Sequence, residues 1–182
     1  MGMDIRALET SIATNPINAG HHHKALINSI FLWGARLSRS DALSTPESEQ
    51  ALYSRALSFL QTYDVATLSP QYGLQAVQAE ILLATYLFTC GGRTLETDLR
   101  ISSAVRLALG LGMNYFNPGN SIDPLNNAEN INVFWNLFIL DQTWAIVNEK
   151  PAIIRTYGNS RISITTPWPL TRSAILQASV IM

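Results

Sequence analysis

The chain has 182 residues, of which 47% are hydrophobic and only 14% are charged, and its formal net charge is −1. A chain of this length can bury one substantial core, and a net charge so close to zero gives it no general attraction for the phosphate backbone of nucleic acid. The single cysteine, Cys90, excludes an intrachain disulfide and a zinc cluster and favours a reducing intracellular compartment, and no apolar run reaches the ~20 residues of a membrane helix.

Residues 1–24 are polar and have no helical periodicity, so we expect a flexible N-terminal arm that includes the three histidines at 21–23. Helical spacing begins near Ala25, and the helix that runs from there to Leu37 has apolar residues on all of its faces. Such a helix is normally buried on every side. Gly34 lowers helix stability, and we expect it to permit the close approach of a second helix.

Two segments then carry helix-start signals. Thr45 supplies a hydroxyl for the N-cap, and Pro46 stands at the first position of the helix that follows. Pro70 opens the next helix, which has the clearest three-four alternation of apolar residues in the chain and ends at the glycines 91–92.

After these glycines the apolar spacing predicts another helix over residues 95–109, with Gly110 or Gly112 as its C-terminal cap. Because the link between the two helices is short, we expect them to form an antiparallel hairpin. The stretch 114–130 is rich in asparagine and contains two prolines, which favours a surface loop.

A fifth helix is expected over residues 131–147, and it carries an acid, Asp141, on its apolar stripe. Pro151 should end this helix, because proline disfavours helical geometry in the residue before it. Residues 154–169 read as an extended C-terminal tail. Residues 171–182 read as the truncated start of a further helix, whose apolar end has no evident packing partner.

Several of these segments are landmarks of a known family when they are taken in order. In this chain they are residues 28–34 (NSIFLWG), 78–84 (QAEILLA), Gly92-Arg93, 103–112 (SAVRLALGLG), Phe134-Trp135, Leu140-Asp141, Pro151 and Pro167-Trp168-Pro169. Their order and spacing, from Leu26 to Pro169, resemble the fungal-specific transcription factor domain, also called the middle homology region.

Two turns depart from the family pattern. The family often has Gly-Leu-His where this chain has Gly112-Met113-Asn114, and Gly-Arg-Pro or Gly-Ser-Pro where it has Glu149-Lys150-Pro151. These departures question the local geometry of the two turns and leave the expected fold unchanged.

The resemblance implies an all-α regulatory domain of antiparallel helix pairs over residues 25–170, belonging to a transcription factor that controls RNA polymerase II in the nucleus, although no import signal is visible in the sequence. Members of the family usually carry a six-cysteine zinc cluster, which would lie upstream and supply the DNA contact. For this chain we expect no enzymatic activity, no cofactor and no direct DNA binding. Its expected partners are other segments of the same factor, the transcription machinery or a small-molecule effector.

Few residues stand out as candidates for a site, and none is expected to be catalytic, cofactor-binding or metal-binding. The histidines at 21–23 lack neighbouring ligands, so metal binding there is the weaker interpretation. A carboxylate on a buried stripe needs a partner, and for Asp141 we expect Arg106 or Arg100 on the preceding helix, with ligand binding as the alternative. The four tryptophans belong either to the core or to an effector pocket; they are Trp33, Trp135, Trp144 and Trp168.

Two other classes of protein remain open from the sequence. Paired helices of this length also occur in free-standing helical-repeat scaffolds, although no repeat is visible. A helical domain that senses or converts a small molecule through an aromatic pocket is the other class. The scarcity of charge, against roughly 25% in an average soluble domain, indicates either a surface of uncharged polar residues or one covered by further chain.

Overall fold

The computed structural model describes residues 20–38, 45–61, 70–90, 94–114, 124–155 and 164. Within these ranges the chain is helical and has no strand, which confirms the predicted all-α class. The helices are α2 (His21–Leu37), α3 (Pro46–Leu60), α4 (Pro70–Cys90), α5 (Thr94–Gly110) and α6 (Pro124–Val147).

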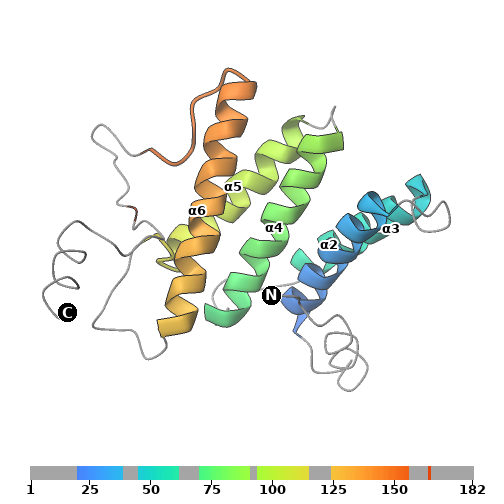
Figure 1. Ribbon diagram of the computed structural model, residues 1–182, viewed down its shortest axis with the longest axis horizontal. Helices are drawn as coiled ribbons and strands as arrows, with labels where there is room; N and C mark the ends of the chain where they lie inside the picture. Colours follow the sequence, from blue (N-terminus) through green and yellow to red (C-terminus); the bar gives the residue numbers. More distant parts are fainter. Residues whose placement is uncertain are drawn as a thin grey trace, which may run out of the picture.

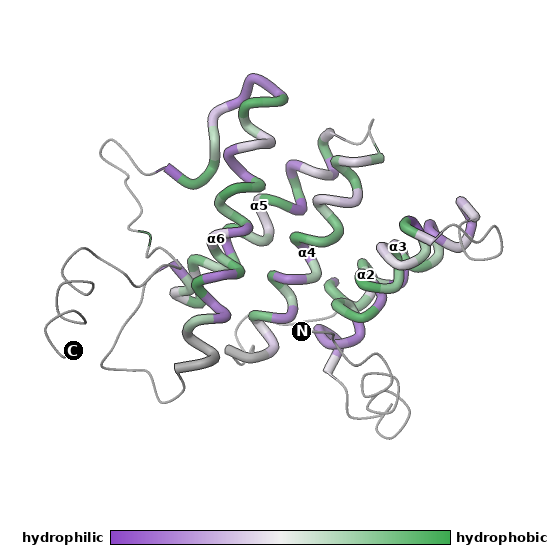
Figure 2. The backbone as a smooth tube through the Cα atoms, in the orientation of Figure 1, coloured by the Kyte–Doolittle hydropathy of each residue, from purple (hydrophilic) through white to green (hydrophobic). Residues whose placement is uncertain are grey.

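The helices form two antiparallel pairs and one additional helix (Figure 1). α2 packs against α3, α4 packs against α5, and α2 also lies along α4, so that α4 is the centre of the domain. α6 contacts both α4 and α5 and runs in the same direction as α4. Hydrophobic residues recur along all five helices, alternating with hydrophilic ones (Figure 2).

Small side chains allow the close packing around α4. Ala76, Ala79 and Ala84 are completely buried in the common core, and alanine lets neighbouring backbones approach while favouring the helix. At Gly73 a Cβ atom would overlap the side chain of Leu111. The start of α4 therefore meets the turn after α5 at a position where only glycine fits without movement.

The predictions for the first helix are partly wrong. The helix begins at His21, so the histidines at 21–23 form its first turn and His22 is buried, whereas a flexible arm was expected up to residue 24. Full burial was also expected, but Phe31 and Leu37 are 46% and 72% exposed. Gly34 is exposed, and among the described residues a Cβ there would meet no atom within 4 Å, so none of the helices α3–α6 approaches it closely. Residues 1–19 of the predicted arm lie outside the described residues.

The predicted helix-start signal at Thr45 is confirmed. The Thr45 hydroxyl oxygen accepts a hydrogen bond of 3.2 Å from the Ser48 N–H, and Pro46 occupies the first helical position. A capped start of this kind satisfies one of the amide groups that a helix leaves unpaired.

The C-terminal end of α5 is closed by Gly112, one of the two predicted caps. Gly112 has a φ of 67°. The Met113 N–H donates a hydrogen bond of 3.0 Å to the Ala108 carbonyl, which closes a turn of six residues. This pattern is the Schellman motif, in which a left-handed residue ends the helix. Met113 is buried at the position where the motif places its apolar contact.

The last helix is longer than predicted, because α6 begins at Pro124 and takes in residues 124–130 of the expected loop. Proline is well suited to a first helical position, so Pro124 fits the observed start although asparagine has weak helix propensity. α6 ends at Val147, before Pro151, as expected. Most of the predicted extended tail lies outside the described residues, but Ile154 is buried in the core and Ile164 packs against it.

The end of α6 repeats the Schellman motif with a residue that does not favour it. Glu149 has a φ of 53°, and the Lys150 N–H donates to the Ala145 carbonyl at 3.0 Å. Glu149 stands where the resembled family often has glycine, so the departure noted in the sequence leaves the turn geometry intact and adds strain to it.

Candidate partner-binding groove

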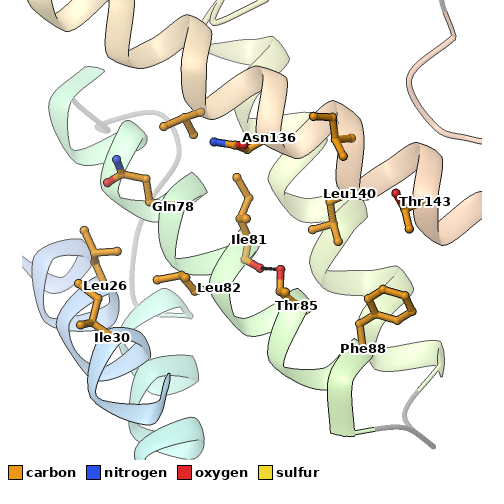
Figure 3. Close-up of a pocket in the computed structure, with 12 residues that line it drawn as sticks. Leu26, Ile30, Gln78, Ile81, Leu82, Thr85, Phe88, Asn136, Leu140 and Thr143 are labelled. Atoms are coloured by element: carbon orange, nitrogen blue, oxygen red, sulfur yellow. Dashed lines mark hydrogen bonds between the residues drawn. The ribbon is translucent and has the colours of Figure 1, made fainter. Parts of the chain in front are cut away.

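An open groove runs along α4 because the helices on either side of it diverge. α2 and α6 both lie against α4, but within the described residues they make no contact with each other. Figure 3 shows the resulting arrangement, in which α4 forms the floor and α2 and α6 form the walls. The groove has a volume of about 680 Å³.

The lining of the groove is apolar and uncharged. Eight of the lining residues are apolar, namely Leu26, Ile30, Ile81, Leu82, Phe88, Val133, Ile139 and Leu140, and four are uncharged polar residues, namely Gln78, Thr85, Asn136 and Thr143. Burying a charge in such surroundings without a partner is costly. The groove therefore favours an apolar, uncharged occupant.

Two of the four polar side chains already form hydrogen bonds within the protein. The Thr85 hydroxyl donates to the Ile81 carbonyl of its own helix at 2.8 Å, and the Gln78 amide donates to the Glu129 carboxylate at 3.0 Å. Asn136 and Thr143 are exposed on α6, along one wall. They are the polar groups best placed to orient an occupant.

The α2 wall is fixed to the floor by Trp33. Its indole N–H donates to the Leu82 carbonyl at 3.0 Å, and its ring meets Tyr86 edge to face at 6.4 Å between centroids. This hydrogen bond from α2 to the backbone of α4 sets the distance between the α2 wall and the floor of the groove.

A buried ion pair fixes α5 to the opposite side of α4. Arg100 Nη1 donates to both carboxylate oxygens of Glu80, at 3.1 and 3.2 Å, and the Ser103 hydroxyl donates to Glu80 at 3.0 Å. Glu80 is only 2% exposed. Burial raises the pKa of the Glu80 carboxyl, while Arg100 and Ser103 act in the opposite direction. This pair was not predicted from the sequence, although Glu80, an acid at an inward position of the helix with the clearest apolar alternation, was the available signal.

Asp141 has a structural partner, but it is not the expected arginine. Its carboxylate accepts hydrogen bonds from the N–H groups of Ile153 at 3.1 Å and Ile154 at 2.8 Å. Burial raises the pKa of the Asp141 carboxyl, and these two backbone bonds oppose the rise. Arg100 instead contacts Glu80, and Arg106 is exposed on α5, so the predicted partners are wrong.

The bonds to Asp141 hold the segment that follows α6 against that helix. Gln142, next to Asp141, donates from its amide to the Ile154 carbonyl at 3.0 Å. Ile154 is 1% exposed and belongs to the core cluster. The acid therefore acts as an anchor for the returning chain, and it does not line the groove.

Of the two interpretations left open for the tryptophans, the core fits Trp144, and neither Trp33, Trp135 nor Trp144 lines the groove. Trp144 is buried in the core, where its indole N–H donates to Asp98 and its ring meets Phe88 edge to face at 5.4 Å. Trp135 is half-buried and packs against Phe138 at 5.3 Å. Trp168 lies outside the described residues.

The chain offers no set of residues for a zinc cluster. Cys90 is its single cysteine and is exposed, and the part of the chain that the structure describes has no group of three His, Cys, Asp or Glu residues able to hold a metal. Burial lowers the pKa of His22, and the neighbouring His21 contributes to the lowering. Residues of this chain therefore do not fit the zinc site that the family resemblance implies.

Comparison with known proteins identifies a family. The family model described as "Fungal specific transcription factor domain" matches residues 7–167. No curated protein and no solved structure matches the chain. None of the helices in the described ranges is both long and apolar enough to span a membrane.

Proposed function

Because the chain belongs to the fungal-specific transcription factor domain family, a family of regulatory regions and not of enzymes, we propose that it regulates transcription by binding an apolar, uncharged partner in the groove between α2, α4 and α6. The single observation that carries this proposal is the lining of the groove, which has eight apolar residues, four uncharged polar residues and no charge. Concave apolar surfaces of this kind are typical of binding sites.

The exposure of the groove supports the same proposal. Ile139 lines the α6 wall and is 49% exposed, whereas the two other apolar groove residues of this helix, Val133 and Leu140, are largely covered. A branched apolar side chain that stays in contact with water loses the ~25 cal/mol per Å² that burial provides. A partner that covers Ile139 would recover this free energy on binding.

DNA contact and zinc binding are assigned by this proposal to a segment of the factor outside the present sequence. The net charge of −1 and the single cysteine support that assignment. The nucleus is the corresponding location, since regulation of RNA polymerase II takes place there.

A reporter assay tests the proposal. The full chain is fused to a heterologous DNA-binding module in a fungal reporter strain, and expression is compared with that of the module alone. The fusion should change expression several-fold in one direction, and Ile139→Asp should abolish the change. Ile146→Asp is the matched control, because Ile146 lies on the same helix, is 78% exposed and does not line the groove.

Two results would contradict the proposal. One is a wild-type fusion that behaves like the DNA-binding module alone. The other is an equal loss of the response in the Ile139→Asp and Ile146→Asp fusions, because the groove would then have no special part in it.

A small-molecule effector is the second candidate for the occupant. The volume of about 680 Å³ lies within the roughly 300–1,000 Å³ of ligand pockets. An apolar metabolite that raises the melting temperature of the wild-type chain, and does not do so for the Ile139→Asp chain, would favour this candidate.

A further inference from the structure

The outward face of α6 carries no charged side chain from Ile131 to Val147. By contrast, α2, α3 and α5 each expose an arginine, at positions 36, 55 and 106. The solvent-facing side of a helix normally holds charged residues, whereas the centre of a protein–protein interface is depleted of them. The outward face of α6 therefore has the composition of an interface. Its exposed residues are Asn132, Asn136, Ile139, Thr143, Ile146 and Val147.

Five of these residues have the spacing of a helix–helix seam. Counted from Asn132, the steps to the next exposed residues are four, three, four and three, and they lead to Asn136, Ile139, Thr143 and Ile146. This alternation averages 3.5 residues, which is the repeat by which two helices pack along each other in a coiled coil. We call these five residues the α6 seam. Its two isoleucines, Ile139 and Ile146, are 49% and 78% exposed.

No other described helix covers the α6 seam. Among the described helices α6 contacts only α4 and α5. Its buried side chains, which include Phe134, Leu137 and Trp144, lie on the side of the helix opposite the seam. Figure 1 shows α6 at the edge of the helical body, on the side away from α2 and α3. The α6 seam is therefore open to a helix from another molecule.

A second copy of this chain matches the α6 seam layer by layer. If two α6 helices lie parallel about a twofold axis, each seam residue meets its own counterpart. Ile139 and Ile146 then pack against isoleucine, and Asn136 meets an amide that can both donate and accept a hydrogen bond. An asparagine at one seam position is also a residue that fixes the register of parallel helix pairs. In an antiparallel pair Asn136 would instead face Ile146, which would bury the amide without a partner.

The size of the α6 seam makes such a dimer weak. From Asn132 to Ile146 the helix rises by about 21 Å, and a helix with its side chains is about 10–12 Å wide. This strip is smaller than the roughly 800 Å² that each partner contributes to a stable interface. The association should therefore depend strongly on protein concentration.

We propose that two copies of this chain associate through their α6 seams as a parallel, twofold-symmetric dimer. This inference goes beyond the proposed function, because the seam includes Ile146, which does not line the groove. The seam and the groove wall share three residues, namely Asn136, Ile139 and Thr143. The dimer and an occupant of the groove therefore compete for the same side chains, so that filling the groove separates the two copies.

Cross-linking of single-cysteine chains tests the inference. Cys90 is replaced by serine in the full chain, and one cysteine is then introduced as Asn136→Cys or Thr143→Cys on the seam, or as Arg106→Cys on α5. The last variant is the matched control, because Arg106 is equally exposed to solvent but lies on another helix. In a parallel pair a seam cysteine faces its own counterpart. Mild oxidation should therefore link each seam variant to itself at least about tenfold faster than the control.

Two further substitutions show whether the cross-link comes from the seam. Ile146→Asp, combined with Asn136→Cys, should abolish the advantage, because it places a carboxylate against its own counterpart. Leu99→Asp should preserve it, because Leu99 is also exposed, at 54%, but lies on α5. In sedimentation equilibrium the wild-type chain should approach twice the monomer mass as its concentration rises, and the Ile146→Asp chain should remain monomeric.

Equal cross-linking rates for the seam and control cysteines, or an advantage that survives Ile146→Asp, would overturn the inference. A mixture in which Ile139→Cys links to Thr143→Cys faster than either links to itself would reveal an antiparallel pair and would overturn the stated arrangement. If the reporter response depends on Ile139 while the seam cysteines do not link to themselves, the groove is functional and only the dimer is wrong.

Discussion

Replacing Glu149 with glycine should stabilise the domain, because Glu149 closes α6 in a conformation that favours glycine. Its φ of 53° places it in the left-handed region. A residue with a Cβ loses about 1–2 kcal/mol there, and glycine loses about 0.5–1 kcal/mol more than other residues through its greater freedom in the unfolded chain. The difference predicts a gain of about 0.5–1 kcal/mol for Glu149→Gly.

The gain is measured by chemical denaturation of the purified chain, and in a melting experiment it corresponds to a rise of about 1–4 °C for a chain of this size. Glu149→Ala is the control. Alanine also removes the carboxylate from the C-terminal end of α6, where a negative charge is unfavourable, but it keeps a Cβ at the strained position. If Glu149→Gly were no more stable than Glu149→Ala, the argument from backbone strain would be refuted.

Three further predictions concern single substitutions within the helices. Arg100→Met should destabilise the domain by about 3 kcal/mol in denaturation experiments, because it removes the only positive charge paired with the buried Glu80 carboxylate in the described residues and leaves the Ser103 hydroxyl as its partner. Since burial raises the pKa of the Glu80 carboxyl, the folded chain takes up a proton there at a higher pH than the unfolded chain does. The free energy of unfolding should therefore rise as the pH falls through the raised pKa, and it should rise more in Arg100→Met than in the wild type. A stability difference between the two chains that is the same at pH 7 and at pH 5 would contradict this reasoning. Asp141→Asn should lower the free energy of unfolding by about 1–2 kcal/mol, because the asparagine amide places an N–H donor opposite one of the two backbone N–H groups. The amide hydrogens after residue 152 should exchange faster with solvent in this variant. Unchanged exchange rates would argue against Asp141 as the anchor of this segment. Gly34→Ala should stabilise the domain by about 1 kcal/mol, as expected for an exposed glycine within a helix. Gly73→Ala should give no such gain in the same denaturation experiment. Equal gains for the two variants would refute the close approach at Gly73.

Features that depend on local sequence could be predicted. The helices, the Thr45 cap and the Gly112 cap follow from short-range patterns, since capping groups and left-handed residues act within one turn of the helix end. The start of α6 is predicted too late because the asparagines in residues 126–130 have weak helix propensity, yet the helix begins at Pro124. Local rules therefore located the elements and misplaced their boundaries.

Features that depend on how the helices are placed could not be predicted. Periodicity shows that α2 is apolar on all faces, but it does not show whether another helix covers each face, and the divergence of α2 from α6 leaves part of α4 uncovered. The partner of Asp141 had no signal either, because every residue except proline carries a backbone N–H. The pairing of Glu80 with Arg100 follows from the register of the α4–α5 hairpin, which the sequence alone does not set.

Phe88 connects the groove with the interior of the domain. Its side chain lines the groove, and the ring meets the edge of Trp144, whose indole N–H is bonded to Asp98. Asp98 also pairs with Lys150, just beyond the strained turn that ends α6. An occupant that moves the Phe88 ring must therefore change the surroundings of a buried indole, so the intrinsic fluorescence of the protein carries a label-free signal of whether its groove is filled.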